Sequence, residues 1–589
     1  MQREKITPIS YLSGRFRTGL TPDAQRQMSA VSLQARQVSL PDSCMSVQGH
    51  EHAGQSLEGH VWSDGEQAIA FCGDFYNLGQ LESLARELVG SRLRFSNVAH
   101  LLAVLLQNCP DRFLALANGK FAIARTGPWG LELVRDRIGE EQVYYATTPD
   151  GGLVFASSVR PLVAALPSAE FYLPDSVRVF ETPVGDQTMF RGIRKLEPGS
   201  HLRLDERGRL SCRRYWQIQG QPPARADERE LASQMRAILE ASIRDRLPAD
   251  VEVSAFLSGG QDSSWVSCTL AELGRRPVRA YTTAFKELDS VYNESRYAQR
   301  VAAHVGTQHI VLEPTSRDFC EHFPVTMAIF DEVKANAAHF TEYWIAKAAA
   351  EHGDRVLFSG YGADEALGGE VRYLVMYLDR RRAEFPPAAI DKHPMLANYG
   401  PLFGILRGCP QEAPEWEKYY ALMRRGAPRG SEEPYQELVR DTFLGANQLV
   451  DQMGLADIAI SGQPLLDSAK VNKYWGVDKV CPFLDPRVIE FAFSLPEDLK
   501  IFGLTTKTLL RAISRGRVPD EITDRTDKVG FAFPHNDPRY ATFIDDLAGA
   551  LSSRTGRHVA TDASRGRYDR TALMAASEEL IYRSYVNFS

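Results

Sequence analysis

The chain has 589 residues, of which 44% are hydrophobic and 24% are charged, and its formal net charge is −7. This length exceeds what one hydrophobic core supports, so at least two domains are expected. The acidic balance gives no reason to expect a nucleic-acid partner. No secretory signal and no apolar run long enough to cross a membrane is found, and the eight cysteines include no CxxC pair that would suggest zinc. These features predict a cytoplasmic protein with reduced thiols.

Residues 60–205 are rich in short strands. Compact apolar or alternating runs stand between Gly, Asp and Pro turns at Ala68–Cys72, Phe121–Ala124, Leu131–Val134, Val143–Ala146 and Leu153–Ala156. This pattern predicts a layered, sandwich-like antiparallel sheet. The polar, proline-bearing stretch Gln219–Asp227 follows and predicts a linker.

Beyond this stretch, strands alternate with helices, which predicts a parallel sheet covered on both faces. The expected strands are Val251–Leu257, Val278–Phe285, His309–Leu312 and Val356–Ser359. The expected helices are Glu228–Arg246, Ser263–Leu273, Tyr297–Val305 and Phe340–Glu351. From about residue 370 onward the pattern is mainly helical.

The loop Ser258-Gly-Gly-Gln-Asp-Ser-Ser264 follows one of these strands and opens a helix. Gly259 and Gly260 allow close approach of the backbone to an anion and positive φ angles. Backbone N–H groups, the loop hydroxyls and the helix N-terminus can then converge on phosphate oxygens. Asp262 would repel phosphate unless it holds Mg²⁺. A tight turn with a Ser or Asp helix cap is the alternative. The hydroxyls concerned belong to Ser258, Ser263 and Ser264.

A second polar segment, Ser359-Gly-Tyr-Gly-Ala-Asp-Glu365, follows the last expected strand. It therefore lies at the carboxyl edge of the sheet, where open α/β folds bind ligands. Asp364 can supply a second carboxylate to Mg²⁺, or Asp364 and Glu365 can cap the next helix. Lys507 stands at an expected helix start, where the helix dipole disfavours a cation, so a phosphate partner would explain it. An exposed, tolerated lysine is the alternative.

These segments resemble the asparagine synthetase superfamily, which includes β-lactam synthetases and lasso-peptide macrolactam cyclases. The resemblance implies an α+β N-terminal glutaminase-like (Ntn-type) sandwich domain at 1–215, a linker at 216–227, and an α/β ATP-pyrophosphatase (adenine nucleotide alpha hydrolase-like) synthetase domain at 228–589. Further blocks that resemble the family occur in the same order at Gly73–Asn77, Asn118–Ala122, Arg135–Gly139, Phe190–Arg194, Phe285–Ala298, Pro482–Asp485, Lys507–Arg511 and Arg525–Gly530.

The resemblance also implies ATP and Mg²⁺ as cofactors and suggests roles for individual residues. Asp262 and Asp364 are the expected metal ligands. Lys507 resembles the essential lysine of the family, which would stabilise the departing pyrophosphate. The other positions implied to lie near the nucleotide are Leu257 and Gly360, close to adenine and ribose, and Lys528, a further phosphate contact.

Tyr361 stands where asparagine synthetases usually carry an acidic residue and β-lactam synthetases carry tyrosine. It can relay a proton from an attacking amine if a carboxylate partners its hydroxyl. Stacking on the substrate or packing against a helix is the alternative. By resemblance, the partner acid falls near Asp467 when a gap is allowed, and Glu365 is a competing general base.

The N-terminal domain is expected to lack glutaminase activity. Asparagine synthetases use a cysteine at the mature N-terminus, whose free amine serves as the base, and residue 2 here is Gln2. Cys44 lies in a context unlike the family's N-terminal segment, and Cys72 is expected to be a core thiol. The amine must then come from free ammonia, from a second molecule or from the substrate itself.

Intramolecular closure is the favoured reaction, because a tethered amine has a very large effective molarity. A β-lactam synthetase-like enzyme of specialised metabolism is the first hypothesis, and a lasso-peptide macrolactam cyclase is the second. An intermolecular amide ligase or an ammonia-dependent asparagine synthetase is third. A catalytically silent homologue that acts as a binding protein is a different class, and the intact ATP loop disfavours it. The expected partner is a small molecule or peptide that bears a carboxylate and an amine. A homodimer is the one assembly considered. No membrane partner is expected.

Overall fold

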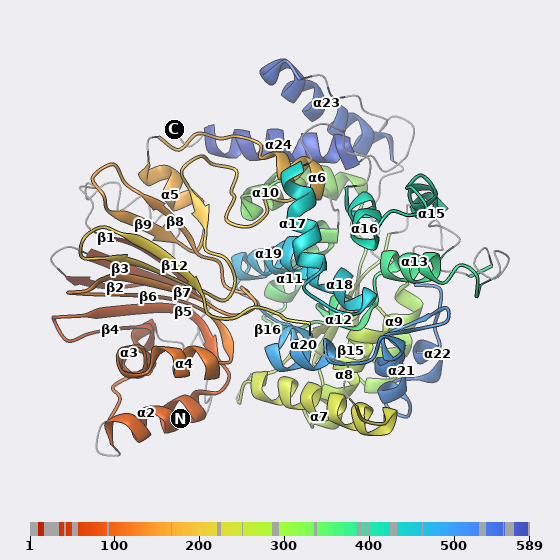
Figure 1. Ribbon diagram of the computed structural model, residues 1–589, viewed down its shortest axis with the longest axis horizontal. Coiled ribbons are helices and arrows are strands. Elements are labelled where there is room, and N and C mark those ends of the chain that lie inside the picture. The colour runs from red at the N-terminus through yellow and green to blue at the C-terminus, as the bar shows by residue number, and fades with distance from the viewer. Residues whose placement is uncertain are drawn as a thin grey trace. The chain divides into compact units, whose positions relative to one another are not determined.

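The computed structural model describes residues 10–16, 34–40, 43–49, 57–90, 94–166, 168–220, 225–249, 251–285, 294–334, 338–385, 392–393, 396, 400–424, 433–461, 463–528, 537–557, 559 and 570–586. The chain divides into two compact units (Figure 1). The first consists of Met1–Pro174, Gly185–Gln217 and Leu247–Val251, and the second of Asp175–Val184, Ile218–Arg246 and Glu252–Ser589.

The first unit differs from the expected range 1–215 in two segments, and its main part ends at Gln217. Asp175–Val184 belongs to the second unit because its apolar side chains, including Val179 and Phe180, pack into the helical core of that unit. The stretch Leu247–Val251 is grouped with the first unit instead.

Two six-stranded sheets form the first unit, and their strands pair antiparallel. One has the order β10 (Arg194–Lys195), β8 (Tyr144–Thr147), β9 (Leu153–Ala156), β1 (Ser10–Phe16), β3 (Ser43–Gly49), β2 (Gln34–Leu40). The other has the order β12 (Leu210–Arg214), β11 (Ser200–Asp205), β7 (Gly130–Arg135), β6 (Gly119–Gly127), β5 (Ala68–Phe75), β4 (Val61–Ser63).

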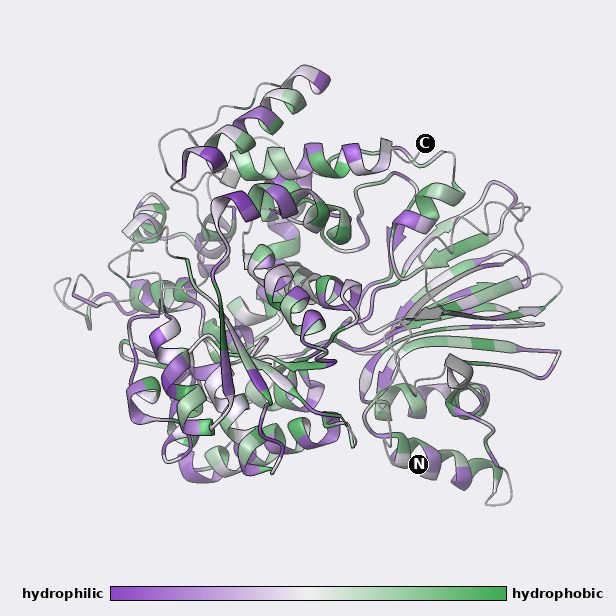
Figure 2. Cartoon of the chain, turned by 180° about the vertical axis from the view of Figure 1, so that it is seen from behind, coloured by the Kyte–Doolittle hydropathy of each residue, from purple (hydrophilic) through white to green (hydrophobic). Residues whose placement is uncertain are grey.

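Side-chain alternation along β5 explains how this sandwich is built. Ala68, Ala70 and Cys72 face a core shared by strands of both sheets, whereas Ile69 and Phe71 pack with the helices on the other side. Figure 2 shows long hydrophobic stretches on these strands, as expected for strands covered on both faces. The helices of this unit are η1 (Leu57–His60), α2 (Leu78–Val89), α3 (Val98–Asn108), α4 (Pro110–Leu116) and α5 (Arg160–Ala165). The predicted antiparallel sandwich is therefore confirmed.

A five-stranded parallel sheet forms the centre of the second unit. Its order is β15 (Gln308–Leu312), β14 (Arg279–Thr283), β13 (Ser254–Phe256), β16 (Val356–Phe358), β17 (Asp478–Val480). The first four strands match the predicted ones, and β17 was not predicted. Helix α11 (Ala338–Glu351) packs Ile345 and Ala349 against Tyr281 and Leu357 of the sheet.

The remaining helices of the second unit surround this sheet or form the helical region beyond it. They are α6 (Asp175–Phe180), α7 (Glu228–Arg246), α8 (Gln261–Glu272), α9 (Ser295–Val305), α10 (Ser316–Phe330), α12 (Ala363–Leu367), α13 (Val371–Arg380), α15 (Gly400–Arg407), α16 (Glu415–Met423), α17 (Glu433–Phe443), α18 (Leu449–Ala456), η4 (Asp457–Ser461), α19 (Gln463–Tyr474), η5 (Pro482–Leu484), α20 (Pro486–Ala492), η6 (Glu497–Leu499), α21 (Thr508–Ser514), α22 (Asp520–Thr523), α23 (Pro538–Thr555) and α24 (Arg570–Val586). A short hairpin of β18 (Ile501–Phe502) and β19 (Thr505–Thr506) precedes α21.

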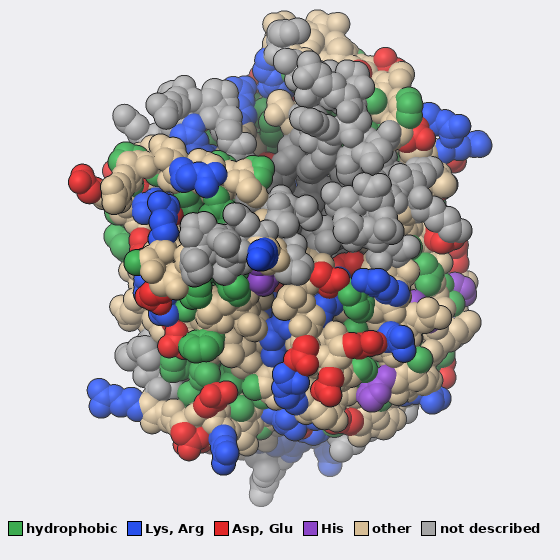
Figure 3. Space-filling model, turned by 90° about the vertical axis from the view of Figure 1, so that its right-hand side faces the viewer, with side chains coloured by type: hydrophobic (Ala, Val, Ile, Leu, Met, Phe, Trp, Pro, Cys, Tyr) green, Lys and Arg blue, Asp and Glu red, His purple; other side chains and the backbone are tan. Residues whose placement is uncertain are grey.

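Among the residues described, no helix is both long enough and apolar enough to cross a bilayer. Acidic and basic side chains are interspersed over the face drawn in Figure 3.

Candidate active site

The candidate site lies where the order of the parallel strands changes direction. From β13 the chain passes to β14 and β15 on one side, and it returns to β16 and β17 on the other. In open α/β sheets, ligands bind in the crevice at the carboxyl ends of the strands at such a point. The loop after β13 and the segment after β16 meet there. A Cβ atom on Gly360 would lie 2.7 Å from both the Cβ of Asp262 and the backbone nitrogen of Ser263, so only glycine allows this approach.

The loop Ser258–Ser264 closes on itself through its own hydroxyl groups. The Oγ atoms of Ser258 and Ser263 lie 3.1 Å apart, and the N–H of Gly260 donates to Ser258 Oγ at 3.2 Å. Gly259 has a φ of 72°, as predicted, but Gly260 has a φ of −82°. The expectation of positive φ at Gly260 is therefore wrong, because this residue already serves as the extended N-cap position of α8. Ser264 is fully buried in the first turn of that helix.

Two carboxylates and two ammonium groups meet beside this loop. Lys507 Nζ lies 2.6 Å and 2.5 Å from the two carboxylate oxygens of Asp262 and 2.6 Å from Asp364 Oδ1. Lys528 Nζ lies 3.4 Å from Asp364 Oδ2 and 3.7 Å from Asp262 Oδ2. Neither α8 nor α12 has a side-chain cap, so Asp262 and Asp364 do not serve as helix caps. The structure thus brings four predicted site residues together.

The charges of this cluster are strongly coupled. Burial alone would raise the pKa of Asp364, but the ammonium groups of Lys507 and Lys528 lower it well below its ordinary value. Burial lowers the pKa of Lys528, yet the carboxylates of Asp364 and Asp262 raise it overall. Lys507 has a φ of 55°, an uncommon left-handed conformation for a side chain of this size, and it stands at the N-cap of α21. Such backbone strain is often found at functional sites.

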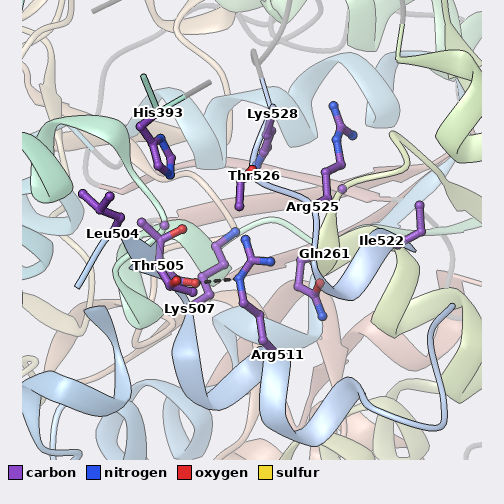
Figure 4. Close-up of a pocket in the computed structure, with 13 residues that line it drawn as sticks. Gln261, His393, Leu504, Thr505, Lys507, Arg511, Ile522, Arg525, Thr526 and Lys528 are labelled. Carbon is purple, nitrogen blue, oxygen red and sulfur yellow. Dashed lines mark hydrogen bonds between the residues drawn. The ribbon is translucent and has the colours of Figure 1, made fainter. Parts of the chain in front are cut away.

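A pocket lined by basic side chains adjoins the cluster (Figure 4). Lys507, Arg511, Arg525 and Lys528 all line it, together with Gly260 at the start of α8. The Arg511 guanidinium donates to the carbonyls of Thr506 and Thr523, which fixes its position. Cations and a helix N-terminus around one hollow suit a polyphosphate.

Asp262 and Asp364 offer two carboxylates from separate loops within reach of one small cation. The described residues contain no group of three or more His, Cys, Asp or Glu side chains that could hold a metal. A pair of carboxylates nevertheless fits Mg²⁺, which commonly takes one or two protein carboxylates and completes its shell with phosphate oxygens and water.

Tyr361 lies next to the cluster and has a carboxylate partner that the sequence did not suggest. Burial raises the pKa of Tyr361 well above its ordinary value, and Glu342 raises it further through its charge and a side-chain hydrogen bond. Lys479 Nζ lies 2.7 Å from Glu342 Oε1 and 3.6 Å from the centroid of the Tyr361 ring. The side chains of Glu342 and Lys479 are only 1% and 2% exposed. Glu342 and Lys479 therefore connect Tyr361 to α11.

The other two predicted catalytic acids are Glu365, which lies in α12, and Asp467. Burial raises the pKa of Glu365 well above its ordinary value, and the charges of Asp364 and Glu370 add to this effect. Asp467 falls within α19, but its side chain lies outside the described residues. Leu257 directly follows β13, and its N–H donates to the carbonyl of Tyr281 at 2.9 Å.

Glu342 and Lys479 were missed because each stands outside any recognisable motif. Glu342 is a single acid in a helix, where most acids face solvent. Lys479 gives no clear signal either, since Val477–Val480 reads Val-Asp-Lys-Val and its charged residues could equally face solvent. Only the folded arrangement shows that the two partner each other.

Two family models match this chain, and they match separate parts of it. A family model for asparagine synthase matches residues 234–586, which is more than half of the chain. The chain belongs to the asparagine synthase family. A model for a glutamine amidotransferase domain matches residues 26–216. These matches confirm the predicted superfamily and the predicted combination of a glutaminase-like domain with a synthetase domain.

Similar proteins cover most of the chain at low identity. Asparagine synthetase [glutamine-hydrolyzing] 1 of Bacillus subtilis is 26% identical over 518 residues, which cover 83% of this chain and 79% of that protein. A putative asparagine synthetase [glutamine-hydrolyzing] of Mycobacterium bovis is 25% identical over 505 residues, covering 79% and 74%. Amidase chry2 of Gibberella zeae is 23% identical over 473 residues, covering 71% and 70%.

Members of this asparagine synthase family are ATP-dependent carbon–nitrogen ligases that release AMP and pyrophosphate, and the chain is such an enzyme. It therefore uses ATP to form amide bonds.

Proposed function

We propose that this asparagine synthase family enzyme forms a lactam, in the manner of a β-lactam synthetase of specialised metabolism. A carboxylate of the substrate is first adenylated by ATP, and an amine of the same substrate then closes the ring without glutamine. The single observation that carries the proposal is the placement of Tyr361. Tyr361 directly follows Gly360, which packs against Asp262 and Ser263 of the ATP loop, and the charge of the Glu342 carboxylate acts on its phenol.

The adenylation step uses the basic pocket and the glycine loop. The substrate carboxylate attacks the α-phosphorus, and pyrophosphate leaves with increasing negative charge. Lys507, Lys528 and Arg511 surround the pocket that would receive it, and fixed cations stabilise such charge in the transition state. When bound between Asp262 and Asp364, Mg²⁺ would supply further neutralisation of the phosphate charge.

The amide-forming step requires removal of a proton from the attacking amine. A phenol whose pKa is raised is not a base alone, because it keeps its own proton. Tyr361 can accept the amine proton only as it passes its hydroxyl proton to Glu342, so the two residues act as one relay. Lys479 keeps the Glu342 carboxylate oriented through the 2.7 Å contact. The amine nitrogen then bonds to the acyl carbon and AMP departs.

Glutamine has no role in the proposed reaction. Cys44 and Cys72 are buried in strands of the first unit, and the Cys72 thiol lies 3.6 Å from Glu141 Oε2 inside the sandwich. Neither thiol is placed to attack a soluble amide. Measurable glutaminase activity in the purified enzyme would contradict this part of the proposal.

A second candidate is amide formation with ammonia or a separate amine as the nucleophile. The names of the relatives favour it, since several are asparagine synthetases. Tyr361 argues for the lactam reaction instead, because a tethered amine has a fixed approach and its proton can be directed to one relay.

ATP–pyrophosphate exchange tests the proposal in two stages. The wild-type enzyme is incubated with a panel of small amino-carboxylates and peptides, and labelled pyrophosphate entering ATP reports adenylation. For each active compound, mass spectrometry then asks whether the product has lost one water from the substrate mass. We expect loss of water without added ammonia, which indicates ring closure.

Other outcomes separate the alternatives. Product formed only with added ammonium would favour an ammonia-dependent synthetase. Ring closure confined to peptides would favour a lasso-peptide macrolactam cyclase, and a product joined to a second molecule would favour an intermolecular ligase. If no compound supports exchange and ATP does not bind, the protein is a silent homologue. The Asp262→Asn variant is the negative control, since it removes a carboxylate of the proposed metal site and should abolish exchange.

A further inference from the structure

Arg525 joins three separate segments at the edge of the ATP site. Its side chain is 5% exposed. Nη1 donates to the carbonyl of Gly259 at 3.2 Å, and Nε donates to Asp527 Oδ1 at 2.7 Å. Nη2 pairs with Glu294, the N-cap residue of α9. The guanidinium carbon also lies 3.9 Å from the centroid of the Tyr297 ring.

The contact of Arg525 with Gly259 determines the direction in which the N–H of Gly260 points. A trans peptide group is planar, so its carbonyl and its N–H point in opposite directions. Arg525 fixes the direction of the Gly259 carbonyl, and the N–H of Gly260 therefore points the opposite way, toward Ser258 Oγ at 3.2 Å. A Cβ on Gly259 would lie 2.5 Å from the nitrogen of Ala298, so α9 supports the loop from behind.

The charge of Arg525 is already neutralised by protein groups. Glu294 and Asp527 both pair with the guanidinium, and the Tyr297 hydroxyl donates to the second oxygen of Asp527 at 2.8 Å. Burial would raise the pKa of Asp527, but the hydrogen bonds from Arg525 and Tyr297 lower it overall. Lys528, three residues later, differs because it points to Asp364 and Asp262.

We propose that Arg525 is a positioning residue of the ATP site. It acts through the Gly259 carbonyl and orients the loop amides toward the β- and γ-phosphates, but it does not itself bind phosphate. This inference rests on the ATP-binding half of the proposed function and names a residue that the proposed reaction does not use.

Isothermal titration of the full-length chain with Mg·ATP and, separately, with AMP tests this role, and neither titration requires the carboxylate substrate. Arg525→Met should weaken ATP binding by about 10- to 100-fold, the effect of one charge-assisted hydrogen bond, and leave AMP binding within about twofold. Arg525→Lys should not restore ATP binding, because an ammonium cannot reach Gly259, Glu294 and Asp527 in one planar fork.

Arg296→Met is the matched control. Arg296 stacks on the same Tyr297 ring at 4.6 Å and pairs with the same Asp527 at 3.6 Å, but it is 73% exposed. This variant should bind ATP like the wild type.

Three results would overturn the inference. If ATP binding survives in Arg525→Met, the loop does not depend on this contact. If Arg525→Lys restores it, the residue acts as a phosphate-binding charge. If ATP and AMP binding fall equally, the variant has lost the site as a whole. Failure of the wild type to bind ATP would instead contradict the proposed function.

Discussion

At the scale of single residues, the proposed role of the Tyr361 hydroxyl affects only the second of the two half-reactions. Tyr361→Phe removes the phenolic oxygen of the proposed relay, Glu342→Gln replaces its carboxylate with an amide, and neither change alters a residue that lines the pyrophosphate pocket. We expect product formation to fall by about 10²–10⁴-fold, the usual contribution of positioned proton transfer, while ATP–pyrophosphate exchange changes by less than about threefold. Rapid-quench assays of both steps measure this difference.

Glu351→Gln is the control for Glu342→Gln. Both acids lie on α11 and both pair with a lysine, but Glu351 is 59% exposed and its partner is Lys347. The control should keep both activities. Equal loss of exchange and product in Tyr361→Phe would remove Tyr361 from proton transfer and favour a packing role.

Lys507 provides a second prediction at this scale, because its ammonium group occupies the space between the two proposed metal ligands. A divalent cation must displace it from Asp262 and Asp364, and bound phosphate would offer it a new partner. Lys507→Met should therefore bind Mn²⁺ at least about tenfold more tightly than the nucleotide-free wild type, yet lose pyrophosphate exchange. Electron paramagnetic resonance titration of free Mn²⁺ measures the affinity.

Lys528→Met is the comparison for Lys507→Met. Lys528 contacts the same carboxylates at 3.4 Å and 3.7 Å, so its removal should increase Mn²⁺ affinity less. Unchanged Mn²⁺ affinity in Lys507→Met would show that the ion pair and the metal do not compete for these carboxylates.

At the scale of elements, the Pro482–Asp485 block has a structural use. Asp485 accepts a hydrogen bond from the N–H of Arg487 as the N-cap of α20, and its carboxylate pairs with Arg246 of α7 at 2.6 Å. Arg246 and Asp485 are 1% and 0% exposed. The pair therefore fastens α7 to α20 inside the second unit.

Arg246→Met should lower the free energy of unfolding of the second unit by about 1–3 kcal/mol, because the buried Asp485 carboxylate loses one of its two arginine partners and keeps Arg487 at 2.7 Å. Calorimetry or denaturant unfolding measures the change. Asp245→Asn is the control: the neighbouring Asp245 pairs with Arg487, both side chains are over a third exposed, and such pairs contribute only about 0–1 kcal/mol. A similar small loss in both variants would argue against a structural role for the buried pair.

The same scale shows which elements the sequence could predict. Helix α7 runs from Glu228 to Arg246 as predicted, because its apolar residues repeat at helical spacing over 19 residues. Strand β17 has only three residues and Lys479 at its centre, so it has no apolar pattern to recognise. Its place in the sheet depends on pairing with β16 and on the partner of Lys479 across the site.

The site residues also fall into two groups, those that the sequence could predict to meet and those that it could not. Asp262 and Asp364 could be expected to meet, since each follows a parallel strand and such strand ends share one edge of the sheet. The chain gives no comparable rule for Glu342, because helical periodicity does not say which polar residue of a mainly buried helix faces a site. The sequence likewise does not show that Asp262 pairs with Lys507 and does not cap a helix, because these two residues lie 245 positions apart in the chain.

At the scale of the whole molecule, the two units carry buried carboxylates with opposite pKa shifts. In the first unit, burial raises the pKa of Asp136 to about 6, despite hydrogen bonds from the N–H groups of Glu141, Glu140 and Gly139. In the second unit, the pKa values of Asp364 and Asp485 are lowered: burial opposes this shift, but nearby Lys and Arg groups outweigh it.

The signs of these shifts predict different responses to acid. Asp136 in the folded first unit takes up its proton as the pH falls through about 6, while the unfolded chain does so only near about 4, so this unit gains up to about 3 kcal/mol between those values. Asp364 and Asp485 contribute stability that is present above about pH 4 and is lost as the pH falls further. Between pH 7 and 4.5, the calorimetric transition of the first unit should therefore rise relative to that of the second. In Asp136→Asn this relative rise should disappear, because the side chain no longer titrates. Parallel pH profiles for the wild type and this variant would show that Asp136 does not control the stability of the first unit.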